Sequence, residues 1–316
     1  MALYPPRGLI IALVTPFDEK GEIDWPSLER LVEKSLPFVD GLLIGEGRIG
    51  EGLSLPNPKR LELLRGAIHL LYGKKPLFLC PTASSEDETL RNLEEASNHA
   101  AQRSPSGPLF WVDIPLWYHS NRKLSDLYAE WKKRTPFSIL VYNHPQLISE
   151  LGQALKRKNI RTSLLHRLSE NEQIVGMIYT GDLRRAIDYQ RAVRLSRDFL
   201  FYDGQEKNFL NQPSSSGVVS SGANLFPDEW KSVVTASLGL PEDPAANMLL
   251  LKHSQKLRAL HEILRANPAQ SIKWALHRLG VIRSPKVFSQ KSSASREPLS
   301  PLEAFLKENF SLQLPT

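Results

Sequence analysis

Polar side chains follow most of the apolar, strand-like runs of this 316-residue chain. In a parallel α/β protein, the carboxyl ends of the strands share one face, and chemistry is done there. Two side chains at these ends suit a small anionic ligand. Arg48 can hold a carboxylate or phosphate through paired hydrogen bonds, and Tyr142 can donate a hydrogen bond. Other polar groups at strand ends include Thr15, Glu46, Glu51, Thr82, Asp113, Asn143, His144, Asp203, Gln205, Glu206, Ser220, Ser221 and Asn224.

Both side chains also have a structural interpretation. Arg48 could form an internal salt bridge with Glu46, Glu51 or Asp113 instead of binding a ligand. Tyr142 could be a buried tyrosine whose hydroxyl is bonded locally. The sequence leaves these alternatives open.

The stretch IVGMIYTGD, residues 174–182, combines a buried strand with a turn in which Thr180 or Asp182 can cap the next helix. No lysine, cysteine, histidine or serine stands at the tip of this strand. No lysine occurs anywhere between Lys158 and Lys207. The stretch is therefore either an active-site strand without a reactive group or a piece of core.

The sequence gives no reason to expect a metal or another cofactor. Residues of metal-ligating type are present at His119, His144, Asp113, Glu46 and Glu206. However, no two histidines have the short helical spacing that metal sites favour. The single cysteine, Cys80, stands beside a proline with no adjacent base, so we expect an inert buried thiol.

The elements that must position these groups alternate between apolar runs and amphipathic helical patterns. The eight runs are residues 9–15, 41–44, 77–80, 109–114, 138–142, 174–178, 199–202 and 217–220. Continuous apolar strands, each followed by a helix, indicate a parallel sheet covered by helices, and eight of them predict a (β/α)₈ barrel. A doubly wound open sheet is the alternative, but no glycine-rich dinucleotide fingerprint supports it. We expect the barrel over residues 1–230 and a C-terminal helical region over residues 231–316.

Composition narrows the class of protein. The net charge is +6, but the lysines and arginines are scattered among acids on helical segments, so we expect no nucleic-acid partner. No run approaches the ~20 apolar residues of a membrane span. The N-terminal stretch lacks the pattern of a signal peptide. Together with the single cysteine, these features predict a cytoplasmic protein with no membrane partner.

Five segments resemble the dihydrodipicolinate synthase and N-acetylneuraminate lyase family, in the family's order. ALVTPFDEKGEID at residues 12–24 is similar to its first strand and helix entry, and GEGRIGEGLSL at 45–55 to its Gly-Thr-Thr-Gly-Glu segment. LVYNHP at 140–145 is similar to its Tyr-Asn-x-Pro strand. YDGQE at 202–206 and GVVSSGANLFP at 217–227 resemble its last two strand ends. The resemblance covers essentially the whole chain.

The resemblance implies pyruvate-dependent aldol chemistry. In the family, a lysine on the sixth strand forms a Schiff base that serves as the electron sink, and a tyrosine on the fifth strand moves protons. Here the lysine position falls at Ile178, and a shift of one residue gives Met177 or Tyr179. None of these side chains is an amine. The resemblance keeps only the tyrosine, at Tyr142.

The remaining family positions also differ. The two threonines that hold the substrate carboxylate are replaced by Arg48 and Ile49, and the paired tyrosines after a proline by Leu116 and Trp117. The arginine expected two residues after Pro145 is Leu147. Because family members assemble as homodimers or homotetramers, the resemblance also implies a homo-oligomer.

We therefore expect a family member with a degenerate active site that lacks Schiff-base lyase activity and binds a small anionic ligand, such as a keto acid or sugar acid. The alternatives are a carbon–carbon lyase or aldolase that acts on a keto acid without an imine, and an ordinary lyase whose lysine comes from elsewhere. Whether any catalysis remains is left open. Tyr142 is the retained catalytic candidate. The ligand-binding candidates are Glu46, Arg48, Ile49, Asp113, Ile178, Tyr179 and Asn224.

Overall fold

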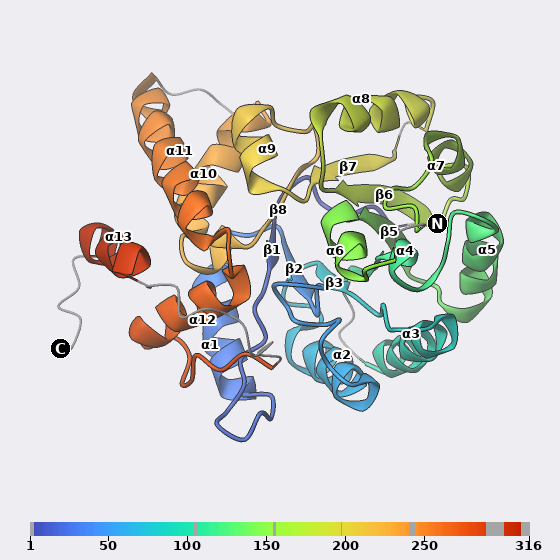
Figure 1. The fold of residues 1–316 in the computed structure, drawn as a ribbon, viewed down its shortest axis with the longest axis horizontal. Helices are drawn as coiled ribbons and strands as arrows, with labels where there is room; N and C mark the ends of the chain where they lie inside the picture. Colours follow the sequence, from blue (N-terminus) through green and yellow to red (C-terminus); the bar gives the residue numbers. More distant parts are fainter. Residues whose placement is uncertain are drawn as a thin grey trace.

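Eight parallel strands form a closed barrel in which each strand pairs with its neighbours in chain order. The computed structural model describes residues 3–103, 107–153, 156–196, 198–239, 244–288 and 300–310. Helices surround the strands (Figure 1). The prediction of a (β/α)₈ barrel is confirmed, and the open-sheet alternative is wrong, because β1 and β8 pair directly. The strands are β1 Gly8–Ala12, β2 Gly41–Ile44, β3 Leu77–Leu79, β4 Leu109–Asp113, β5 Ser138–Asn143, β6 Ile174–Tyr179, β7 Leu200–Asp203 and β8 Gly217–Ser220.

The strands are buried along their whole lengths, as their continuous apolar runs predicted. The observed ends lie within three residues of the predicted ones, and those of β2 and β8 coincide with them. Closure between β1 and β8 requires a close backbone approach at Gly217, where an added Cβ would lie 1.9 Å from the carbonyl oxygen of Gly8. The Asn224 amide adds a polar link, because it donates to the carbonyl of Ala12 (2.8 Å) and accepts from the amide of Val14 (3.2 Å).

The helices begin where the sequence provides caps. Asp24 accepts from the amide of Ser27 and caps α1, Ser85 caps α3, and Asp182 accepts from the amide of Arg185 at 2.9 Å and caps α8. Up to the last strand, the helices are α1 Trp25–Ser35, α2 Asn57–Leu71, α3 Glu86–Ala101, α4 Pro115–Tyr118, α5 Leu124–Arg134, α6 Pro145–Glu150, α7 Thr162–Leu168, α8 Leu183–Ala192 and α9 Glu206–Asn211.

Helices follow the last strand, as predicted. They are the 3₁₀ turn η1 Gly222–Asn224, α10 Pro227–Ser237, α11 Pro244–Leu264, α12 Pro268–Arg278 and α13 Ser300–Phe310. The proposed boundary between residues 230 and 231 falls inside α10, and the division into two units stays a prediction. Helix α11 packs beside α9 and α10 (Figure 1), which brings its C-terminal end to the strand tips. Within the described residues, no helix is both long and apolar enough to cross a membrane.

A buried ion pair joins the C-terminal helices to the barrel. Lys273 on α12 is fully buried, and its ammonium contacts the carboxylate of Glu51 in the loop after β2. The ammonium also donates to the carbonyl of Lys286 at 3.0 Å and lies 4.2 Å from the ring centroid of Phe17. The other oxygen of Glu51 accepts from the amide of Phe288 at 2.7 Å. The pair therefore fixes α12 against the loop that carries Arg48.

Replacing Lys273 by methionine should destabilise the protein strongly, because it leaves the Glu51 carboxylate buried without a cation. We expect the free energy of unfolding to fall by ~3–5 kcal/mol. The matched control is Lys133→Met, which removes an exposed lysine paired with Glu130 and should cost less than ~1 kcal/mol. Urea unfolding of both variants gives the comparison. Equal losses in the two variants would contradict the role assigned to the buried pair.

Candidate functional site

A cavity of about 320 Å³ opens at the carboxyl ends of the strands. Its wall combines the loop after β2, the tips of β5 to β8 and the end of α11. The lining side chains include Glu46, Arg48, Ile49, Tyr142, His144, Thr180, Glu206, Lys207, Ser221, His261, Glu262 and Arg265. This is the face on which barrels of this class carry their working groups.

The loop after β2 turns tightly around the buried carboxylate of Glu46. One oxygen of Glu46 accepts from the backbone amides of Arg48 (2.9 Å) and Ile49 (2.6 Å). Thr15 donates to the carbonyl of Gly50 at 2.7 Å and ties the loop to the end of β1. Burial raises the pKa of Glu46, and the two amides and the charge of Arg48 oppose that rise. The carboxylate of Glu46 therefore holds the loop through the backbone amides of Arg48 and Ile49 rather than through a salt bridge.

Arg48 lies in the wall of this cavity and also of a second, adjoining cavity of about 410 Å³. Its guanidinium is 4.0 Å from the carboxylate of Glu150, and both side chains are partly exposed. Ion pairs of this solvated kind contribute ~0–1 kcal/mol. Burial raises the pKa of Tyr142 and lowers the pKa of His144, and the charge of Arg48 opposes the first shift and adds to the second.

The salt bridges expected for Arg48 are not the ones that form. Glu51 contacts Lys273 instead. Asp113 accepts hydrogen bonds from the hydroxyls of Thr82 (2.7 Å), Tyr118 (2.9 Å) and Tyr128 (2.8 Å). These three hydroxyls stabilise the Asp113 carboxylate without a cation. Burial raises the pKa of Asp113 to about 6. The guanidinium of Arg48 is therefore left at the cavity.

Tyr142 and Ile178 are register partners on β5 and β6. Their side chains converge below Gly204, where an added Cβ would lie 3.0 Å from Ile178 Cγ2 and 3.1 Å from Tyr142 Cε2. Ile178 is fully buried, and Tyr142 is 4% exposed and lines the cavity. The tip of β6 therefore puts an alkyl group, not an amine, beside the phenol.

No described residue forms a hydrogen bond with the Tyr142 hydroxyl, which differs from the expectation of a locally bonded hydroxyl. Burial raises the pKa of Tyr142 well above its usual value, and the negative charge of Glu46 adds to the effect. The phenol is therefore protonated and can donate to a bound molecule.

His144 is a second neutral donor beside Tyr142, with a ring-centroid separation of 5.3 Å. Its Nδ1 accepts from the amide of Leu147 at 3.3 Å and caps α6. Burial lowers the pKa of His144 to about 3, and the charge of Arg48 contributes to the lowering. Because Nδ1 accepts, the ring proton sits on Nε2.

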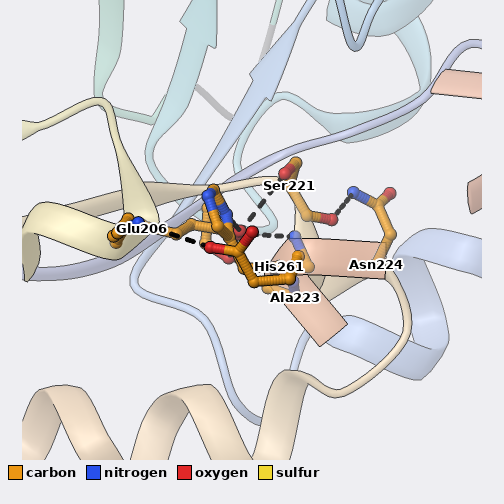
Figure 2. Close-up of polar contacts among 9 residues, drawn as sticks. Glu206, Ser221, Ala223, Asn224 and His261 are labelled. Carbon is orange, nitrogen blue, oxygen red and sulfur yellow. Dashed lines mark hydrogen bonds and ion pairs between the residues drawn. The ribbon is translucent and has the colours of Figure 1, made fainter. Parts of the chain in front are cut away.

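Glu206, the first residue of α9, lines the same cavity and accepts four hydrogen bonds (Figure 2). The donors to one oxygen are Ser220 Oγ (2.7 Å), Ser221 Oγ (3.3 Å) and the amide of Gly222 (2.6 Å). His261 Nδ1 on α11 lies 3.3 Å from the other oxygen. Burial raises the pKa of Glu206, but these donors outweigh it, and the pKa falls below its ordinary value. No signal in the sequence marks His261, because the pattern around it predicts only that a helix forms.

Four of the proposed ligand-binding residues lie outside the cavity lining, and one of them is Ile178, the fully buried residue beside Tyr142. Asp113 is fully buried among its three hydroxyl partners. Tyr179 donates to the carbonyl of Asp182 at 3.0 Å and packs against Tyr189. Asn224 uses its amide in the link between β1 and β8. The bonding capacity of these last three is used within the protein, which argues against a role in binding.

Other reactive side chains do not gather into a site. Within the described residues, no three His, Cys, Asp or Glu side chains converge in a way that could hold a metal ion. His119 lies 3.8 Å from Glu86 and does not line the cavity. Cys80 is buried, and burial raises the pKa of its thiol to about 12, so it is not a thiolate at neutral pH.

Comparisons with known proteins all find dihydrodipicolinate synthases. The model of the dihydrodipicolinate synthetase family matches residues 5–313. The chain is 27% identical over 304 residues to 4-hydroxy-tetrahydrodipicolinate synthase of Stutzerimonas stutzeri, which covers 92% of this chain and 95% of that protein. The synthase of Pseudomonas aeruginosa is 26% identical over 283 residues, with 87% and 89% covered.

Solved structures agree on the fold. A monomeric dihydrodipicolinate synthase variant has a TM-score of 0.78 at 23% identity and covers 97% of each chain. The Thermotoga maritima synthase has a TM-score of 0.75 at 23% identity, with 98% of this chain and 100% of that chain covered. At these identities, the similarity establishes the fold but not the chemistry of the cavity.

His144 should remain neutral over the whole pH range in which the protein is folded. A pKa of about 3 lies below the ~6.5 of a free histidine, so its contribution to stability is present above pH ~6.5 and lost as the pH falls toward 3. Relative to His144→Asn, which keeps a capping acceptor, the wild type should lose about 3 kcal/mol of unfolding free energy between pH 7 and pH 4.

The same histidine can be followed by ¹H–¹⁵N correlation spectra of its ring. They should show an Nε2–H tautomer with no titration between pH 5 and 8. A midpoint near 6.5 would contradict the buried, neutral ring.

Proposed function

The chain belongs to the dihydrodipicolinate synthetase family, and we propose that it binds a small carboxylate in the barrel cavity without forming a Schiff base. On this proposal the active site is degenerate, and the lyase reaction that depends on an imine is lost. The protein is then a family member that retains a binding site for a keto acid or sugar acid.

The observation that carries the proposal is the identity of residue 178. The resemblance puts the Schiff-base lysine there, and strand register puts Ile178 directly beside Tyr142. A Schiff base needs a primary amine, which isoleucine lacks. Among the described residues that line the cavity, Lys207 is the one lysine, and its half-exposed ammonium pairs with Glu262 at 3.4 Å.

The remaining donors favour an anion with a carbonyl or hydroxyl group. Arg48 offers a charged fork, and Tyr142 and His144, which line the same cavity, each offer one neutral donor. Charge-assisted hydrogen bonds to a carboxylate are the strongest of these contacts. The charges of Lys207 and Arg265 are less available, because both pair with Glu262. The ligand should therefore place its carboxylate at Arg48.

A carbon–carbon lyase or aldolase that works without an imine is the second candidate. The unbonded hydroxyl of Tyr142 supports it, because that tyrosine is the retained catalytic position of the resemblance. General acid–base help from one residue is worth ~10²–10⁴-fold, which does not replace a covalent electron sink. We therefore rank this candidate second.

We also propose a homodimer or homotetramer in the cytoplasm. The curated relatives are synthases that match this chain over nearly their whole length. The single buried cysteine suits a reducing compartment. The relative described as a monomeric variant shows that this fold also exists without partners. Sedimentation velocity decides between these states.

Treatment with pyruvate and borohydride should leave the intact mass unchanged, because no amine forms an imine that can be reduced. Ile178→Lys is the matched control: an amine placed beside Tyr142 should allow a reduced pyruvate adduct. A pyruvate adduct on the wild-type protein would overturn the proposal and identify the lysine responsible.

Replacing Arg48 by alanine should abolish most of the binding of pyruvate, used as the probe. Loss of a charge-assisted hydrogen bond costs ~1.5–3 kcal/mol of binding free energy, which raises the dissociation constant by ~10- to 150-fold. Thermal shift over a pyruvate titration measures this. Arg134→Ala is the control, because Arg134 pairs with Glu94 on the outer helices. Equal shifts for wild type and Arg48→Ala would contradict the placement of the carboxylate.

A further inference from the structure

Glu206 and His261 form a pair on the cavity wall that binding of a carboxylate at Arg48 does not use. Glu206 comes from α9, directly after β7, and His261 comes from the end of α11. Their side chains meet at 3.3 Å between Nδ1 and Oε2 (Figure 2). Glu206 is buried, whereas His261 is about one-fifth exposed and lines the cavity.

The carboxylate fixes the tautomer of the histidine. Ser220, Ser221 and the amide of Gly222 donate to one oxygen of Glu206, which keeps the carboxylate ionised although it is buried. An ionised carboxylate accepts only, so His261 must carry its proton on Nδ1. In the neutral ring, Nε2 then holds a lone pair, and no described residue bonds to it. A carboxylate that orients a histidine in this way is the arrangement of a general base.

We propose that His261 removes a proton from the carbon next to the carbonyl of a small 2-oxo acid bound in this cavity. In this step the C–H bond breaks, the proton moves to Nε2, and the electron pair shifts to the carbonyl oxygen, giving an enolate. Return of the proton, or of a deuteron from solvent, restores the keto acid. Glu206 acts as a positioning residue that also stabilises the imidazolium.

The other polar groups favour proton transfer over acyl transfer. The hydroxyls of Ser220 and Ser221 donate to Glu206 rather than to His261, so neither is set up as a nucleophile. The developing enolate carries negative charge, and Arg48 and the hydroxyl of Tyr142 are available to stabilise it. This inference rests on the proposed function, because it needs a 2-oxo acid held without an imine.

The test is exchange of the methyl protons of pyruvate in D₂O, followed by loss of the methyl ¹H signal. The wild type should exchange them faster than a protein-free sample in the same buffer. His261→Gln should slow the protein-dependent rate by about 100-fold, within the range for loss of a general base. His166→Gln, an exposed histidine on α7 that lines no part of the cavity, should leave the rate unchanged.

Glu206→Gln separates positioning from structural support. Its amide can donate to Nδ1, which favours the tautomer with the proton on Nε2 and removes the lone pair from the cavity. The exchange rate should fall at least tenfold, while the dissociation constant of pyruvate, measured by calorimetry, should stay within about twofold. Unchanged binding also shows that both cavity variants are folded.

Different failures point to different errors. Pyruvate binding without faster exchange, or exchange that survives His261→Gln, overturns the general-base assignment and leaves the proposed function standing. Exchange that is lost after treatment with pyruvate and borohydride would show an imine route and overturn both. Absence of pyruvate binding also overturns both.

Discussion

Closure of the barrel is the constraint on which the cavity depends. The polar groups of the site come from chain positions as distant as Glu46 and His261, and they meet because β1 pairs with β8. That pairing needs glycine at position 217, where the backbone of Gly8 leaves no room for a side chain. Asn224, in η1 directly after β8, ties its amide to the end of β1. An open sheet would place the loops after β2 and β7 far apart, and no common cavity would form.

Within the barrel, the buried acids and the cavity donors differ in how far their hydrogen-bonding capacity is already used. Glu46 and Glu206 accept hydrogen bonds from neighbouring backbone amides, and Glu206 from hydroxyls as well, so they shape the wall and stay in place. Among the described residues, the guanidinium of Arg48 has one ion-pair contact, long and solvated, with Glu150, and the hydroxyl of Tyr142 has no hydrogen-bond partner. The groups with remaining hydrogen-bonding capacity are therefore the ones that a ligand can engage. Beside Tyr142, the tip of β6 carries Ile178, an alkyl side chain.

The sequence predicted the barrel well because its signals are local. Eight apolar runs and caps such as Asp24 and Asp182 report on residues that lie close together in the chain. It predicted the site less well. Asp113 and Asn224 stand at strand ends, but their partners come from distant segments and use up their hydrogen bonds. His261 was missed for the same reason, since only the packing of α11 against α9 brings it to Glu206.

We propose above all that the cavity holds a keto acid without a covalent bond to the protein. A crystal structure of the protein with bound pyruvate, at a resolution that separates the ligand from side chains, tests it directly. We predict a discrete pyruvate whose carboxylate contacts the guanidinium of Arg48 and whose carbonyl lies near the Tyr142 hydroxyl. Continuous density between the C2 carbon of pyruvate and a lysine Nζ would contradict the claim.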